Sequence, residues 1–113
     1  MRFFAFKEIF YDTISAGGKA EPSFRADADY IIKYVLFVDK DDRSLSKLRV
    51  TMFLEQDAIT KDIVCATLFG RNIRDAWELN LPIKAEQQLR LTVVNEDSVD
   101  RTVSIVLALY TPS

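Results

Sequence analysis

The sequence contains no histidine and only one cysteine, Cys65. Without histidine, the commonest general base and metal ligand is missing, as is the usual partner of serine and cysteine nucleophiles. A lone cysteine cannot form an internal disulfide, and a zinc site would have to be built from carboxylates alone. Cys65 stands between Val64 and Ala66 in an apolar run, which favours a small buried side chain over a reactive thiol. We therefore expect a protein that is not an enzyme and that carries neither a cofactor nor a metal.

Glycine is scarce, and long apolar runs are missing. None of the three glycines stands in a phosphate-binding loop or a dinucleotide-binding fingerprint. No stretch approaches the roughly 18 apolar residues of a membrane helix, and Lys7, Glu8 and Asp12 interrupt the aromatic N-terminus before a signal peptide could form. The net charge of −2 gives no reason to expect a nucleic acid partner. We expect neither membrane nor nucleic acid binding.

Acidic residues gather in three short clusters, which are Asp39, Asp41 and Asp42, then Asp27 and Asp29, then Glu96, Asp97 and Asp100. The first cluster resembles a calcium loop, but Ser44 stands where that loop needs glycine and Val50 where it needs glutamate. Aspartate also favours turns, because its side chain accepts hydrogen bonds from nearby backbone. We expect all three clusters to be turns, since nothing pairs two of these acids across a cleft.

Short β-type segments separated by turn residues make up the chain; they are 7–15, 23–26, 30–39, 48–56, 62–69, 76–83, 89–95 and 101–110. Their spacing of roughly ten residues predicts a single all-β domain over residues 1–113, an antiparallel sandwich of about eight strands, jelly-roll-like. We expect 30–39 and 48–56 to form a hairpin, and at most one helical turn in 71–79. Alternation in 76–83 places Trp77 in the core rather than on a sugar-stacking surface.

The last segment is apolar on both of its sides. Read with a period of two, Val103, Ile105 and Leu107 point one way, whereas Val106 and Ala108 point the other. An antiparallel sheet with one face in water should instead alternate apolar and polar residues. Segment 30–39 repeats this pattern. A two-sheet sandwich has one interior, so the surplus apolar surface predicts a contact with another molecule.

Residues 1–15 form an aromatic N-terminal arm that runs into the first strand. The arm could reach a neighbouring copy, or it could fold back over its own sandwich; we favour the first, a homo-oligomer with a trimer among the symmetries considered. The expected contact residues are Phe3, Phe4, Phe6, Phe10, Tyr11, Tyr34 and Tyr110.

Residues 59–110 include "ITKDIVCATLFG" and "AWELNLPIKAEQQLRLTVVNEDSVDRTVSIVLALY". This half resembles the small jelly-roll or β-sandwich virion proteins of tailed phages and archaeal viruses. The resemblance implies a homo-oligomeric capsid decoration or cement protein, a major capsid or tail protein as partner, and a place in the virion after assembly in the host cytoplasm. It brings no catalytic residues. The alternative is a non-catalytic binding module that recognises a carbohydrate or peptide through end loops such as 70–75 and 95–100.

Overall fold

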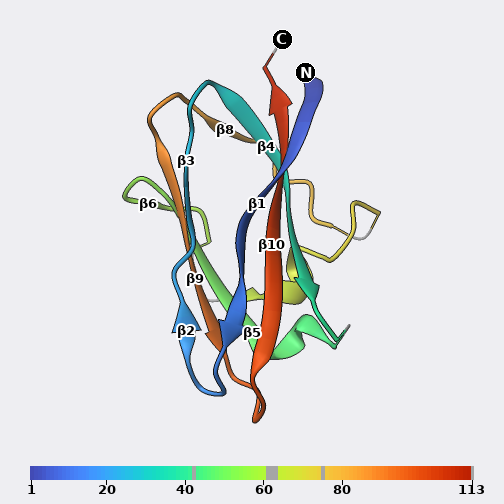
Figure 1. The fold of residues 1–113 in the computed structure, drawn as a ribbon. Helices are drawn as coiled ribbons and strands as arrows, with labels where there is room; N and C mark the ends of the chain where they lie inside the picture. Colours follow the sequence, from blue (N-terminus) through green and yellow to red (C-terminus); the bar gives the residue numbers. More distant parts are fainter. Residues whose placement is uncertain (42, 61–63, 75, 113) are drawn as a thin grey trace.

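The computed structural model describes residues 1–41, 43–60, 64–74 and 76–112, and it is built almost entirely of strands (Figure 1). The first sheet has the order β1-β10-β4-β8 and is antiparallel; its strands are β1 (Arg2–Ile14), β10 (Arg101–Thr111), β4 (Tyr30–Asp39) and β8 (Leu81–Ile83). In the second sheet β9 (Gln88–Asn95) pairs with β5 (Leu48–Leu54). Four short strands flank that pair: β2 (Lys19–Ala20), β3 (Ser23–Arg25), β6 (Asp57–Ala58) and β7 (Val64–Cys65).

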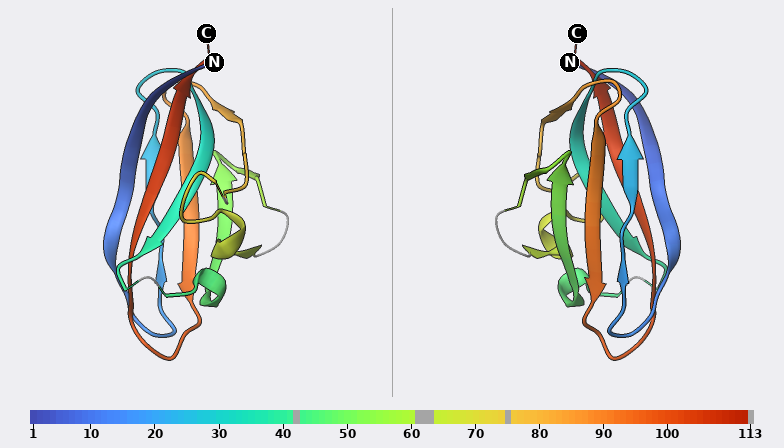
Figure 2. Two further views of the ribbon diagram at one scale, coloured as in Figure 1. Left: turned by 90° about the vertical axis from the view of Figure 1, so that its right-hand side faces the viewer. Right: turned by 90° about the vertical axis from the view of Figure 1, so that its left-hand side faces the viewer.

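The two sheets lie face to face and enclose one hydrophobic core (Figure 2). Core side chains alternate along the central strands, as in Leu89, Leu91 and Val93 of β9 and Val103, Ile105 and Leu107 of β10. This is the antiparallel β-sandwich that the spacing of the segments predicts. No helix in the described part of the chain is long and apolar enough to cross a membrane.

The predicted hairpin of 30–39 and 48–56 is wrong, because β4 and β5 belong to different sheets. The partner of β4 is β10, and the partner of β5 is β9. Between them the chain crosses the sandwich through the 3₁₀ helix η1 (Leu45–Lys47), whose Leu45 is buried in the core. A connection of this length is longer than a tight hairpin turn needs, and it lets each strand bury its apolar side in the shared interior.

Two predicted strands are shorter than expected. Of the predicted segment 62–69 the structure describes residues 64–69, in which β7 is the extended part and the 3₁₀ helix η2 (Ala66–Leu68) follows it. In 76–83 only β8 is a strand, because Asn80 has a φ of 50° and breaks the extended backbone. Trp77 therefore falls out of phase with β8; it is 39% exposed and packs on the Phe69 ring with 5.9 Å between centroids. Its predicted place in the core is wrong, and no residue described in 71–79 is helical.

β-Bulges change which side chains face the core. The pairing of β4 with β10 shifts where Ile32 and Tyr34 oppose Leu109 and Ala108, so Lys33 is an extra residue. Ile32 points inward before the bulge and Val35 after it, both fully buried. A strict period of two, which would place Ile31 on the same side as Val35, therefore does not hold across β4. Two further shifts in β1 leave Phe4 and Ile9 as extra residues.

The N-terminal arm is an edge strand of its own sheet. β1 pairs with β10 from Arg2↔Thr111 to Ile14↔Arg101, and the two chain ends lie together at one end of the molecule (Figure 1). The arm therefore extends the first sheet instead of folding over its outer side, and its outward aromatic side chains stay exposed.

Candidate interaction surfaces

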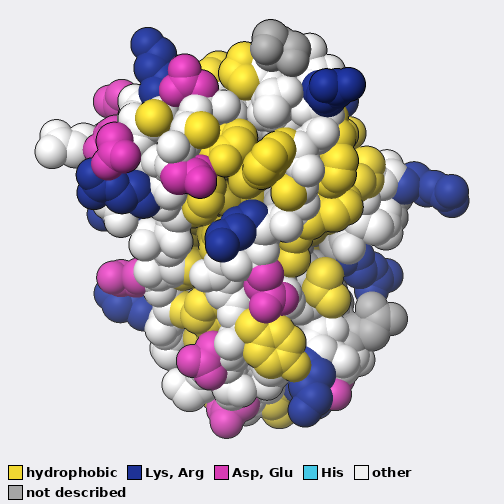
Figure 3. All heavy atoms as spheres, turned by 45° about the horizontal axis from the view of Figure 1, so that its top comes forward, with side chains coloured by type: hydrophobic (Ala, Val, Ile, Leu, Met, Phe, Trp, Pro, Cys, Tyr) yellow, Lys and Arg dark blue, Asp and Glu magenta, His cyan; other side chains and the backbone are white. Residues whose placement is uncertain are grey.

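The outer side of the first sheet carries a continuous group of apolar and aromatic side chains. Cross-strand pairs define it: Phe3 opposes Tyr110, Phe6 opposes Ala108, and Ala108 in turn opposes Tyr34. We call it the outer patch; it consists of Phe3, Phe6, Tyr34, Leu36, Val38, Val106, Ala108 and Tyr110. In Figure 3 hydrophobic side chains gather in one area near the upper end of the molecule, with charged side chains around them.

Aromatic contacts hold the upper part of the outer patch together. The Phe3 ring lies 5.0 Å from that of Phe6 and 5.4 Å from that of Tyr110, the latter pair edge-on. The Lys33 Nζ lies 4.9 Å from the centre of the Tyr110 ring and 3.5 Å from Oε1 of Glu78. Both contacts are favourable for a cation, so Lys33 is fixed at the border of the patch.

Exposure divides the outer patch into a covered floor and an exposed surface. Leu36 and Ala108 are buried although neither belongs to the interior cluster, because their neighbours on the same side cover them. Phe3, Phe6 and Val38 are 46%, 53% and 43% exposed. Contiguous exposed apolar areas of this kind usually mark a contact with another molecule.

Three of the seven expected contact residues lie outside the outer patch. Tyr11 shares its side of the sheet and is 60% exposed, but Glu8, which accepts a hydrogen bond from Ser104 Oγ at 2.6 Å, lies between it and the patch. Phe10 is half-buried and packs against the core. Phe4 is turned away by its bulge and stacks on Tyr30, with ring centroids 5.4 Å apart. Sequence periodicity could not separate these residues, since nothing in it locates the bulges.

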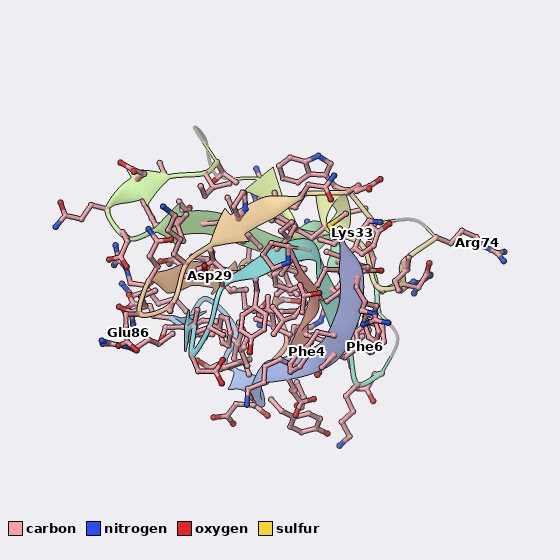
Figure 4. The ribbon with its side chains drawn as sticks, turned by 90° about the horizontal axis from the view of Figure 1, so that it is seen from above. Phe4, Phe6, Asp29, Lys33, Arg74 and Glu86 are labelled. Atoms are coloured by element: carbon pink, nitrogen blue, oxygen red, sulfur yellow. The ribbon has the colours of Figure 1, made fainter. Side chains whose placement is uncertain are left out.

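A groove of about 570 Å³ opens where β1 and β3 form neighbouring edges of the two sheets. Phe4, Phe24 and Tyr30 line it together with Lys7 and Arg25. Figure 4, seen from above, shows Phe4 and Phe6 on β1 and places Glu86 and Asp29 together on one side of the molecule, with Arg74 on the other. The groove was not predicted from the sequence, because the crossing connections bring its walls together.

Contacts at the rim of this groove fix the loops above it. The Tyr30 hydroxyl donates to Asp27 Oδ1 at 2.7 Å, and this bond, burial and the Asp27 charge together raise the pKa of Tyr30. Arg25 pairs with Glu86 at 2.6 Å. Asp29 accepts from the Ala85 N–H at 2.9 Å, which joins the β3–β4 and β8–β9 loops.

At the opposite end a buried arginine joins the β4–β5 connection to the β9–β10 loop. Arg101 is 1% exposed; its guanidinium donates to Asp39 Oδ2 at 2.5 Å, to Asp97 Oδ2 at 3.0 Å and to the Ser44 carbonyl at 2.6 Å. Buried Asn95 adds bonds to the carbonyls of Ile14 and Val99. Because each of these groups is bound to another, the cluster is suited to holding loops and offers no reactive group.

This network lowers two carboxyl pKa values. Burial alone would raise the pKa of Asp39, but the hydrogen bonds from Arg101 and the Asp41 N–H outweigh it, and the net pKa is lowered. The pKa of Asp97 is lowered by the Ser98 N–H, against some burial, and further by Arg101. Both carboxylates are therefore charged in the folded protein at neutral pH.

The acidic clusters serve as turns, as predicted, where the structure describes them. Asp39 Oδ1 accepts from the Asp41 N–H at 2.8 Å, and Asp97 Oδ1 accepts from the Ser98 N–H at 2.7 Å. Asp42 and the Cys65 side chain lie outside the described part. Among the residues that the structure describes, no three His, Cys, Asp or Glu side chains are placed to share a metal ion.

The two loops of the alternative prediction are not neighbours. Residues 95–100 form the lower end of the molecule, whereas the described residues of 70–75 lie beside β4, where the Gly70 carbonyl accepts from the Phe37 N–H at 2.9 Å (Figure 1). They do not form one loop surface. No protein-family model matches this chain, and no curated protein or solved structure shows significant similarity to it.

Proposed function

We propose that this chain is a non-catalytic structural subunit that assembles with copies of itself through the outer patch. The carrying observation is the exposed aromatic and aliphatic side of the first sheet, over a core that is already complete without it. The resemblance of residues 59–110 to small jelly-roll or β-sandwich virion proteins supports a place in a capsid or tail.

The outer patch would form the centre of a contact with a second copy. About five residues on each of three adjacent strands span a plane of about 240 Å². A standard interface buries ~800 Å² per partner, so the contact would extend over residues around the patch, such as Ile31 and Tyr11 on the same side of the sheet. The net charge of −2 adds little repulsion between copies.

The distribution of side chains also suits packing of like on like. On β1 the patch residue Phe6 lies at the level of Ala108 of β10, and Ala108 also opposes Tyr34 of β4. A twofold axis along β10 keeps this level and would lay Phe6 of each copy on Tyr34 of the other. Twofold dimers are the commonest closed assemblies of soluble proteins.

The contact uses the side of the sheet and not its edge. β1 is a long edge strand, but its two bulges interrupt a regular ladder, and Lys7 opposes the core residue Leu107 and so points to the inner side. Bulges and inward charges are devices by which edge strands avoid pairing with their own copies.

The assembly is tested by Phe6→Glu, which places a charge in the outer patch. We expect its mass in sedimentation equilibrium to fall to that of one chain, with unchanged far-UV circular dichroism. Phe53→Glu is the matched control: Phe53 lies on the outer side of the second sheet under Arg90, and its variant should keep the wild-type mass. A Phe6→Glu variant with wild-type mass would contradict the proposal.

The virion setting needs a separate test. Particles purified from lysed host cells should contain this chain in a fixed ratio to the major capsid protein, as quantified by mass spectrometry. Particles that lack it, from cells in which the free protein is abundant, would contradict the decoration role while leaving the oligomer intact.

A further inference from the structure

The groove between β1 and β3 is bordered by an unpaired strand edge. β1 is the end strand of the first sheet, and among the described residues its outer edge pairs with no other strand. Between the bulges at Phe4 and Ile9, residues 5–8 keep a regular register with β10. Their free backbone groups have the spacing that an added strand would satisfy.

The floor of the groove is aromatic and preformed. Phe4 stacks on Tyr30 at 5.4 Å, and Tyr30 and Phe24 are 7% and 9% exposed. Ala5, whose cross-strand partner Leu109 belongs to the core, leaves space beside these rings. An apolar side chain that enters here opposite Ala5 would meet rings that are already ordered.

The charges of the groove favour an anionic occupant. Arg25 is paired with Glu86, and Asp27 accepts from the Tyr30 hydroxyl. Lys7 faces the groove and has no ion-pair partner among the residues described. Glu8 also lines the groove, but its carboxylate accepts from Ser104 Oγ, so Lys7 is the cation of this lining that remains to be matched.

We propose that this groove binds an extended peptide strand of a partner protein, added antiparallel to β1, with an acidic residue opposite Lys7 and an apolar residue opposite Ala5. These two positions are two residues apart and point to the same side, so the recognised pattern is acidic, any residue, apolar. The backbone bonds provide affinity, and the two side chains provide specificity. The groove shares Phe6 with the outer patch, and its other lining residues lie outside that patch.

A foreign strand fits better than a copy of β1. A second β1 in register at this position would place two Lys7 ammonium groups opposite each other, and like charges directly opposite are destabilising. The same lysine therefore disfavours this self-pairing and favours an acidic strand.

The test uses fluorescein-labelled octapeptides, acetylated and amidated, with a central Glu-x-Leu, and with Lys-x-Leu or Glu-x-Ser as comparisons. By fluorescence anisotropy the wild type should bind Glu-x-Leu about tenfold more tightly than either comparison. Lys7→Glu should reverse the charge preference, so that Lys-x-Leu binds best. Lys47→Glu, on exposed Lys47 of η1, is the matched control and should leave the order unchanged.

Equal binding of the three peptides, or a Lys7→Glu variant that keeps the wild-type preference, would overturn the proposal. The oligomer is a separate readout. Lys7→Glu should keep the wild-type mass. Val38→Glu, at an exposed outer-patch residue that does not line the groove, should become a single chain and still prefer Glu-x-Leu over Lys-x-Leu. A loss of the oligomer in Lys7→Glu would assign the groove to the interface between copies and overturn the peptide site.

Discussion

The two outer sides of the sandwich differ although both sheets share one core. On the second sheet the outward positions of β9 are Gln88, Arg90, Thr92 and Val94, and those of β5 are Arg49, Thr51 and Phe53. Phe53 lies under Arg90, and Arg49 pairs with Glu96 at 3.2 Å. The first sheet shows instead the outer patch. The second sheet turns mostly polar and charged side chains outward, whereas the first exposes apolar and aromatic ones, which is the basis of the proposed contact.

Substitution of the buried Arg101 should lower the stability of the fold most. Arg101→Met leaves Asp39 charged and buried without its partner, and we expect a loss of about 3–5 kcal/mol in the free energy of unfolding. Urea denaturation measures it. Arg43→Met is the control, because Arg43 is exposed and its contact with the Asp100 carbonyl is 3.5 Å long; it should cost less than about 0.5 kcal/mol. Equal losses would show that the network does not hold the loops.

The two sides of β10 allow the comparison within one strand. Leu107 is fully buried in the interior, and Leu107→Ala should lower the free energy of unfolding by about 2–5 kcal/mol. Its neighbour Val106 points to the outer patch and is only half-buried. In the Phe6→Glu background, Val106→Ala should cost less than about 1 kcal/mol. If Leu107→Ala and Val106→Ala lowered the free energy of unfolding equally in that background, Val106 would be as well packed as Leu107 in a single chain. The outer patch would then need no second copy to cover it.

Acid should weaken the loops at the lower end. A carboxyl group with a lowered folded pKa stabilises the fold above its unfolded pKa, near 3.9, and this contribution is lost as the pH falls through the folded value. For Asp39 and Asp97 the loss therefore begins at about pH 4 and continues below it. Thermal unfolding from pH 2 to 6 should show a steeper decline in the wild type than in Asp97→Asn. Identical slopes for the wild type and Asp97→Asn would contradict a stabilising role of the Asp97 carboxylate in this pH range.

A substitution on the polar outer side of the second sheet should have the smallest effect on stability. Arg90→Gln removes the guanidinium that lies 5.4 Å from the centre of the Phe53 ring. At an exposed site this contact contributes about 0.5–1 kcal/mol, and the mass in solution should stay unchanged. A change of mass in this variant would move the interface to the second sheet.

The sequence predicts some elements well and others poorly, for local reasons. Segment 30–39 matches β4 residue for residue, and 101–110 differs from β10 only at Thr111, because long β-branched runs have few alternatives. The positions of the bulges leave no local signal in the sequence. The same holds for the change of sheet between β4 and β5. Trp77 was placed wrongly because Asn80 has a positive φ, which interrupts the strand. The alternation of apolar and polar residues in the sequence cannot reveal such a break.

The residues of the outer patch were predictable to the same extent. Excess apolar residues on both sides of β10 and β4 predicted an exposed surface, and Phe3, Phe6, Tyr34 and Tyr110 do gather there. Phe4 and Phe10 do not, because the bulges at Phe4 and Ile9 change their direction. The groove depends on Phe24 and Tyr30, which only the folded chain brings next to β1.

The most direct test of the outer patch as an interface between copies is the mass of the wild-type protein in solution. One chain has a mass of 13.0 kDa. Sedimentation equilibrium across a wide concentration range should give a stable multiple of that value, converted to single chains by Phe6→Glu. A wild-type protein that stays a single chain at every concentration would contradict the account.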